Sequence, residues 1–100
     1  MENWTFDWSN TFKKLYKNKD NSVKPKVDEK LKELATSDPF KFGKRKKGLK
    51  YSNNAYAVKV DKSNRIVYEP LIQDGQKIIR LLKVCDHKTL YGRDRVLVFP

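Results

Sequence analysis

Apolar and polar positions alternate most clearly over residues 55–69, and this pattern predicts a β-hairpin. In the first half, apolar residues alternate with small or charged ones, which is the two-residue period of a strand. A polar turn follows, and the returning half is rich in β-branched and aromatic side chains. The hairpin places two long cations, Lys59 and Arg65, on either side of one turn. The functional interpretation depends on whether these cations face a site or plain solvent.

The first forty residues change from the strand period to the helix period. A short strand is predicted over Glu2–Asp7. A helix capped by Ser9 or Asn10 follows, and its apolar face is Trp8, Phe12, Leu15 and Tyr16. A second helix is expected to begin at a Ser22 cap and to end within 36–39, because the residue before a proline disfavours the helical region. Two helices joined by a short loop predict an antiparallel helical hairpin.

The second half of the chain adds strands. The segment 77–84 has too continuous an apolar run for a one-sided strand, so a central strand covered on both faces is expected. The order β-α-α-β-β-β, with a possible extra strand over 96–100, predicts an α+β fold. In this fold the helices pack on one face of a twisted antiparallel sheet, and the open face carries the basic groups. Residues 1–100 are expected to form a single domain.

Charge changes this picture more than any other property of the composition. The chain holds 23 Lys and Arg against 12 Asp and Glu, a net charge of +11 with a pI near 9.8. Such a balance favours nucleic acid as a partner, because phosphate binding releases counterions. A solvated basic surface, an acidic protein partner and an anionic membrane face are the alternatives. Six cations crowd into positions 41–50: Lys41, Lys44, Arg45, Lys46, Lys47 and Lys50. This basic loop either contacts phosphate or is simply solvated, and the repulsion that a polyanion would relieve favours phosphate.

Several classes of protein do not fit. The chain has no apolar run near the length of a membrane span and no secretory signal pattern, so a cytoplasmic protein without a membrane is expected. Cys85 is the only cysteine, which excludes an internal disulfide and a cysteine-based zinc site. No glycine-rich phosphate motif or metal-spaced cluster occurs, so neither a cofactor nor a metal is predicted.

Metal-free cleavage of RNA is the chemistry that the remaining residues can support. The 2′-OH of the substrate is then the nucleophile, and the protein moves protons and stabilises charge on phosphorus. Arg65 offers a fixed fork for phosphate oxygens, and Lys59 a second positive charge. His87 is the only side chain whose ordinary pKa suits acid or base work at neutral pH. Tyr91 could stack on a base or position a proton.

Each of these four residues has an alternative, structural role. The arginine can form a surface ion pair with Glu69 or Asp61, and the lysine can face solvent from an exposed strand. The lone histidine can be a structural residue that follows a strand, and the tyrosine can be a core aromatic. The residues alone leave these alternatives open.

Seven short motifs occur in an order and spacing typical of one protein family. They are Phe12–Leu15, Val27–Leu31, Asp38–Phe40, Lys47–Lys50, Tyr56–Val60, Asn64–Glu69 and Val84–Tyr91. The motif Asn64–Glu69 is similar to that family's Tyr-Arg-apolar-apolar-Tyr strand. Over nearly its whole length the chain resembles the RelE/ParE superfamily of toxins from type II toxin–antitoxin systems. The resemblance implies a RelE-like fold, a helical hairpin on a twisted antiparallel sheet.

The RelE-like members resemble ribonucleases that enter the ribosomal A site and cut mRNA there without metal. By this resemblance Arg65 matches the catalytic arginine, Lys59 a basic residue on the preceding strand, and Lys47 falls near the general base. His87 matches the His or Arg of the last motif, and Tyr91 its aromatic. The cations expected to bind RNA are Lys44, Arg45, Lys46, Lys50, Lys88 and Arg93. The chain departs from the family where Asn64 replaces an aromatic or histidine and where Cys85-Asp86 replaces a glycine-containing turn.

Three functions therefore remain open. The first is a ribosome-dependent mRNA endonuclease whose partners are the 30S A site and mRNA. The second is a ParE-like inhibitor of DNA gyrase without nuclease activity, and the third is a basic RNA-binding module without catalysis. Arg65, His87 and Tyr91 together with the +11 charge favour the first. In each case an acidic antitoxin is expected to cover the basic face and to pair with an exposed strand.

Overall fold

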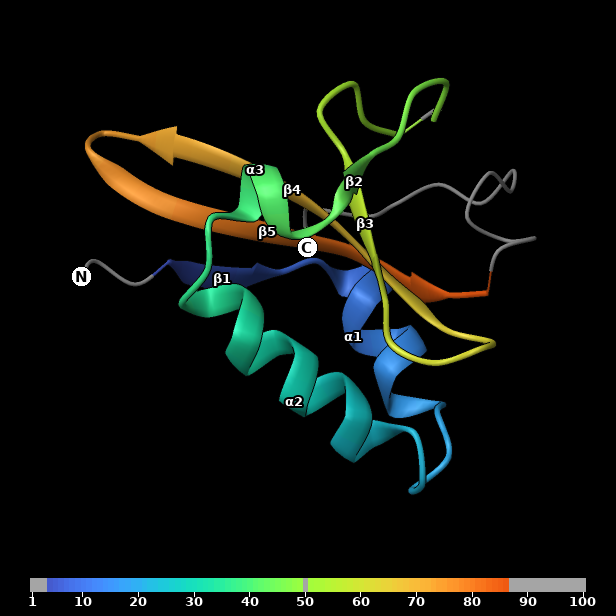
Figure 1. The fold of residues 1–100 in the computed structure, drawn as a ribbon. Helices are drawn as coiled ribbons and strands as arrows, with labels where there is room; N and C mark the ends of the chain where they lie inside the picture. The colour runs from blue at the N-terminus through green and yellow to red at the C-terminus, as the bar shows by residue number, and fades with distance from the viewer. Residues whose placement is uncertain (1–3, 50, 87–100) are drawn as a thin grey trace.

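The computed structural model describes residues 4–49 and 51–86, and there the predicted α+β fold is confirmed (Figure 1). Its elements are β1 (Thr5–Trp8), α1 (Asn10–Lys17), α2 (Lys24–Ala35), α3 (Pro39–Phe42), β2 (Lys44–Arg45), β3 (Tyr56–Lys59), β4 (Arg65–Gln73) and β5 (Gln76–Cys85). The five strands form one sheet in the order β1-β5-β4-β3-β2. Within the described ranges, no helix is long and apolar enough to cross a membrane.

The sheet is mixed, with one parallel pairing at its β1 edge. The pairs β2–β3, β3–β4 and β4–β5 are antiparallel, as expected, but β1 lies parallel to β5, with Thr5 opposite Ile78 and Trp8 opposite Leu81. Parallel neighbours need a long crossover, and here that connection contains both long helices and the three other strands. The predicted hairpin is confirmed as β3 and β4, and Lys59 lies directly opposite Arg65.

The helix starts illustrate two kinds of capping. Ser9 caps α1, and its Oγ accepts a hydrogen bond from the backbone N–H of Phe12 at 3.0 Å. The predicted Ser22 cap of α2 is wrong: the helix begins at Lys24 without a side-chain cap. A backbone turn orders this start instead, because the carbonyl of Asp20 accepts hydrogen bonds from the N–H groups of Val23 and Lys24. The predicted end of the helix before Pro39 is confirmed, since α2 stops at Ala35.

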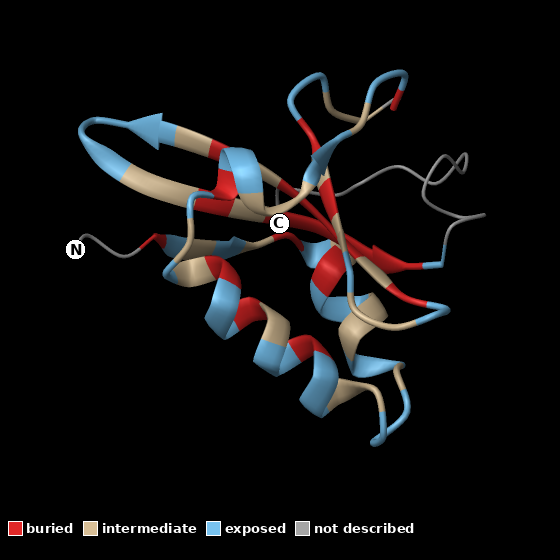
Figure 2. Ribbon diagram, in the orientation of Figure 1, coloured by how far each residue is buried: buried red, intermediate tan, exposed pale blue. Residues whose placement is uncertain are grey.

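Two apolar clusters lie on opposite faces of the sheet. In Figure 1 both long helices lie on one side of the sheet, and in Figure 2 buried positions line the sides of α1 and α2 that face it. The larger cluster fills this interface and includes Phe12, Leu31, Leu34, Ile66, Tyr68, Ile79 and Leu81. The smaller cluster is Leu49, Ala55, Ala57, Val67, Leu82 and Cys85. We refer to its side of the sheet as the open face. The predicted central strand, β5, is therefore covered on both faces.

The ladder between β4 and β5 contains a bulge in β5. Val67 of β4 is opposite Lys83, but Tyr68 is opposite Leu81, so Leu82 is an extra residue in the ladder. Leu81 packs in the larger cluster and Leu82 in the smaller one, as the alternation of adjacent strand residues places them. One strand thus supplies consecutive apolar side chains to both faces.

The segment 40–50, predicted as a loop, contains two short elements instead. The carboxylate of Asp38 accepts a hydrogen bond from the N–H of Phe40 at 3.0 Å and so caps α3, a helix of four residues. Lys44 and Arg45 then pair with β3 as the two-residue strand β2. Elements this short have no periodic signal, so the apolar pattern could not reveal them.

Candidate functional site

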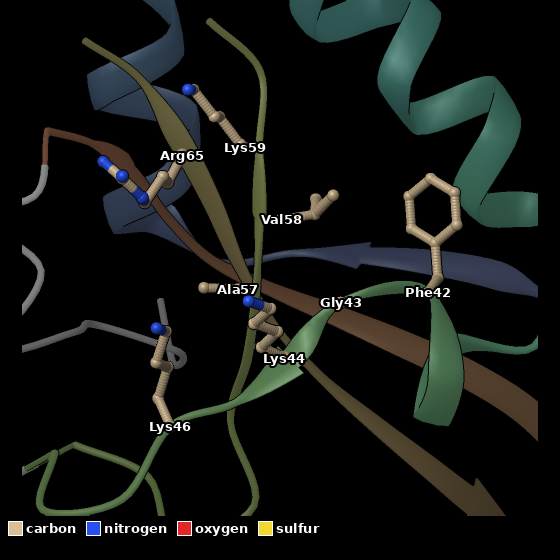
Figure 3. A pocket seen from close by; sticks show the side chains of 8 residues that line it. All are labelled: Phe42, Gly43, Lys44, Lys46, Ala57, Val58, Lys59 and Arg65. Atoms are coloured by element: carbon tan, nitrogen blue, oxygen red, sulfur yellow. The ribbon is translucent and has the colours of Figure 1, made fainter. Parts of the chain in front are cut away.

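A pocket of about 300 Å³ opens where β2, β3 and β4 meet (Figure 3). Its lining is Phe42, Gly43, Lys44, Lys46, Ala57, Val58, Lys59 and Arg65. Four of these eight residues are cations, and no carboxylate is among them. The pocket therefore has the electrostatics of an anion-binding site.

Lys59 and Arg65 form the cationic centre of this pocket. They are directly opposite each other on β3 and β4, so their side chains leave the sheet on the same face, about 5 Å apart at Cβ. Like charges at opposed positions destabilise a sheet. The arrangement is thus unfavourable for the free protein and becomes favourable when an anion lies between the two side chains.

Two carboxylates, those of Glu69 and Asp61, could have formed an ion pair with Arg65, but both interact with other residues. Glu69 lies 3.7 Å from the guanidinium of Arg80 and accepts a hydrogen bond from the hydroxyl of Ser52 at 2.6 Å. Asp61 lies 3.9 Å from the ammonium group of Lys26. Among residues 4–49 and 51–86, no ion pair joins a carboxylate to any of the four cations of the pocket.

The turn between β3 and β4 fixes the register that pairs the two cations. One carboxylate oxygen of Asp61 accepts hydrogen bonds from the N–H groups of Ser63 and Asn64, both at 2.8 Å. The side-chain amide of Asn64, only 7% exposed, also donates to Asp61 at 3.1 Å. The hydrogen bond from Ser63, followed by those from Asn64 and the charge of Lys26, holds the pKa of Asp61 below its ordinary value. Asn64, the departure from the family motif, thus has a structural role in this turn.

Solved structures of several bacterial toxins share this architecture. A double mutant of E. coli toxin RelE in the free state is 19% identical, with 87% of this chain and 86% of that chain covered at a TM-score of 0.65. The toxin–antitoxin complex RelBE of E. coli gives 19% identity, 83% and 95% coverage, and a TM-score of 0.65. A YoeB/ParE toxin from Agrobacterium tumefaciens gives 14% identity, 83% and 98% coverage, and a TM-score of 0.64. The chain has the RelE toxin fold. No protein-family model matches the sequence, and no curated protein matches it significantly.

The RelE-like fold brings together four of the cations that the sequence singled out. Lys44 and Lys46 lie beside Lys59 and Arg65 in the pocket. Lys47 is exposed and is not part of the lining, so its expected place near the general base stays a prediction. The other sequence candidates, namely Lys50, His87, Lys88, Tyr91 and Arg93, lie outside the described residues.

Arg45 is separated from the pocket by the alternation of β2. It is opposite Tyr56, while its neighbour Lys44 is opposite Ala57, so the two cations leave the strand in opposite directions. The guanidinium of Arg45 donates a hydrogen bond to the backbone carbonyl of Asn53 at 3.1 Å. Arg45 therefore ties the 46–55 loop to β2, a role that the run of like charges did not indicate.

Lys83 is a residue of the open face for which the sequence interpretation found no role. Its side chain is 2% exposed, and its ammonium group lies 4.8 Å from the centre of the Tyr51 ring. Lysine is almost never this buried without a compensating partner. Lys83 is opposite Val67, one step along the open face from the row that holds Arg65. A charged residue inside an otherwise apolar run was the signal that could have identified it.

Proposed function

We propose that the protein is the toxin of a type II toxin–antitoxin system and acts as a metal-independent endoribonuclease. In this proposal the protein is cytoplasmic, cuts mRNA in the ribosomal A site and so inhibits translation. One observation carries it: Lys59 and Arg65 face each other in a pocket with two further cations and no described carboxylate. The RelE fold, shared with free and antitoxin-bound E. coli toxins, supports the same conclusion.

The proposed reaction is an in-line transfer at one phosphodiester of the mRNA. A base removes the proton of the 2′-OH, the 2′-oxygen bonds to phosphorus, and the 5′-oxygen leaves with a proton from an acid. The products are a 2′,3′-cyclic phosphate and a free 5′-OH. The guanidinium fork of Arg65 suits two equatorial oxygens of the phosphorane, and Lys59 adds charge beside it. Acid and base roles are proposed for His87, Tyr91 and Lys47.

The basic surface also indicates the partner that would restrain the toxin. A net charge of +11 favours an acidic antitoxin that covers the cationic pocket. One structural neighbour is a complex of the toxin RelE with its antitoxin. By this analogy we propose a cognate antitoxin for the chain.

A gyrase-directed toxin is the second candidate. The A. tumefaciens neighbour is described as a YoeB/ParE toxin, and its TM-score of 0.64 is nearly that of the E. coli toxins. The fold alone therefore does not separate the two activities. The grouping of four cations around a pocket of about 300 Å³, with no carboxylate among its lining residues, favours the nuclease.

A translation reaction separates these candidates directly. Purified protein is added to a defined mRNA with and without ribosomes, and the cut positions are mapped by primer extension. Cuts at A-site codons that require ribosomes, and that Arg65→Ala abolishes, are the expected result. Lys13→Ala is the matched control, because Lys13 is an exposed cation of α1 outside the pocket. Intact mRNA together with trapped gyrase–DNA complexes would support the gyrase inhibitor and contradict the nuclease.

A further inference from the structure

The hydroxyl of Tyr68 forms two hydrogen bonds that the chemistry above does not use. It donates to the backbone carbonyl of Pro39 at 2.6 Å and accepts from the backbone N–H of Gly43 at 2.9 Å. Tyr68 is fully buried in β4, the middle strand of the five, whereas Pro39 begins α3 and Gly43 directly follows it. A single oxygen atom therefore holds both ends of α3 against the sheet.

The segment around α3 depends on such tertiary contacts for its position. An isolated helix of four residues is far too short to be stable in water. The strand that follows, β2, has only two residues and pairs with β3 alone. Neither element has enough hydrogen bonds of its own to set where its side chains lie.

The fit at Gly43 shows how closely this segment approaches the sheet. A Cβ atom at this position would lie 2.7 Å from the Tyr68 hydroxyl oxygen and 2.8 Å from the carbonyl oxygen of Ala57. Both distances are shorter than normal contacts, so the backbone at Gly43 can lie here only without a side chain. The next residue, Lys44, enters the cationic pocket directly from this joint (Figure 3).

We propose that Tyr68 is a positioning residue for the phosphate-binding pocket. Its hydroxyl fixes the joint between α3 and β2, so that Lys44 is held against β3 beside Lys59 and Arg65. This inference rests on the proposed function to the extent that the pocket binds RNA phosphate. Tyr68 itself faces the helices and does not touch the substrate, so it acts through Lys44.

Tyr68→Phe tests this role because it removes only the oxygen atom. The ring keeps its burial and its stacking on Tyr56, whose centroid lies 5.8 Å away. Tyr56→Phe is the matched control, since the Tyr56 hydroxyl makes no hydrogen bond to any other described residue. Gly43→Ala provides a second variant, which displaces the same joint from its other side.

The measurement is the affinity for a short single-stranded RNA with 2′-O-methyl riboses, which cannot be cut, between about 50 and 200 mM salt. Tyr68→Phe is expected to weaken binding about three- to tenfold, because Lys44 then loses its contact with one phosphate. It should also reduce the slope of log affinity against log salt by about one, since one phosphate contact is lost. Lys44→Ala should do the same, and the double variant should match either single variant. Tyr56→Phe should match the unmodified protein.

A merely structural role for Tyr68 predicts a different pattern. The melting temperature would then fall while the salt slope stayed unchanged, and the losses from Tyr68→Phe and Lys44→Ala would multiply. An unchanged salt slope in Tyr68→Phe overturns the positioning role, and so do losses that multiply. A Gly43→Ala variant with the salt slope of the unmodified protein overturns it as well. If the unmodified protein does not bind the RNA, the inference also falls.

The failure of this inference and that of the proposed function are distinguishable. Ribosome-dependent cleavage with an unchanged salt slope in Tyr68→Phe would contradict only the positioning role. The expected slopes without any cleavage on ribosomes would contradict only the nuclease.

Discussion

Lys59 and Arg65 are directly opposite each other across the β3–β4 hairpin, where two like charges destabilise the sheet. The turn at Asp61 keeps the two residues in this register, and no described carboxylate forms an ion pair with either of them. The pairing therefore favours an anion in the pocket at some expense of stability in the free protein.

Replacing Lys59 should consequently stabilise the free protein and weaken its function. Lys59→Thr removes the repulsion and introduces a residue with high strand propensity, so the free energy of unfolding should rise by about 0.2–1 kcal/mol. Urea denaturation at low salt measures this change. Lys62→Thr, at an exposed position of the turn, is the control and should have a smaller effect. A loss of stability in Lys59→Thr would show that repulsion is not the dominant interaction of this pair.

Removing Arg65 should abolish activity without unfolding the protein. Arg65→Ala is expected to stop growth arrest in cells that express the protein, because the guanidinium fork for phosphate is lost. Its melting temperature should stay close to that of the unmodified protein, since no described carboxylate depends on this cation. Arg65→Lys keeps the charge but not the fork and should recover little activity. Continued growth arrest by a folded Arg65→Ala protein would contradict the nuclease.

Acidic pH should weaken the turn that sets the register. The pKa of Asp61 is lowered in the folded protein by the hydrogen bonds from Ser63 and Asn64 and by Lys26. Its contribution to stability is therefore present above its ordinary value of 3.8 and is lost as the pH falls through the lower, folded value. The difference in unfolding free energy between the unmodified protein and Asp61→Ala should shrink as the pH is lowered through this range. A difference that stays constant over this range would contradict the role of the Asp61 carboxylate in this turn.

Alkaline pH should weaken the contact between β4 and α3. Burial raises the pKa of Tyr68 from 10.0 to about 12, so the folded state favours the neutral hydroxyl. The stability that this group contributes is present below pH 10.0 and is lost as the pH rises toward about 12. The quantity to compare is the difference in unfolding free energy between the unmodified protein and Tyr68→Phe, because the contributions of all other groups then cancel. A difference that stays constant over this range would show that the Tyr68 hydroxyl is exposed to water, which would contradict its burial.

Two glycines should respond to alanine for different reasons. Gly43→Ala forces a Cβ atom against the Ala57 carbonyl and the Tyr68 hydroxyl, and should cost about 1–3 kcal/mol of unfolding free energy. Gly48 has open space around it but a φ of +78°, so Gly48→Ala should cost about 1 kcal/mol through backbone strain. Thermal and urea unfolding measure both. A smaller loss for Gly43→Ala than for Gly48→Ala would mean that the joint has room to relax.

The parts of the fold that were predictable are those encoded within a few residues. The period of two located the β3–β4 hairpin, and the Ser9 cap located the start of α1. The parallel β1–β5 pairing joins residues 73 positions apart, such as Phe6 and Ile79, and no local pattern specifies it. The same limit applies to the Tyr68 hydroxyl, whose partners are distant in sequence.

The candidate site was predictable in its cations but not in its boundaries. Lys59 and Arg65 followed from the hairpin, because opposed residues share a face. The basic run suggested six equivalent cations, yet Lys44 and Lys46 line the pocket while Arg45 and Lys47 do not. Which cations line it depends on the two-residue strand β2, which sets the direction of each side chain.

The bulge at Leu82 gives β5 two half-strands of opposite phase. A deletion of this one residue would restore strict alternation and leave both halves in place, because Leu81 would still be opposite Tyr68 and Lys83 opposite Val67. The open face would lose a side chain, since Leu82 packs in the smaller cluster, while Leu81 would stay in the larger one. The extra residue therefore adds apolar contact to the open face without moving the helical core, so this face can change its packing while the helices keep theirs.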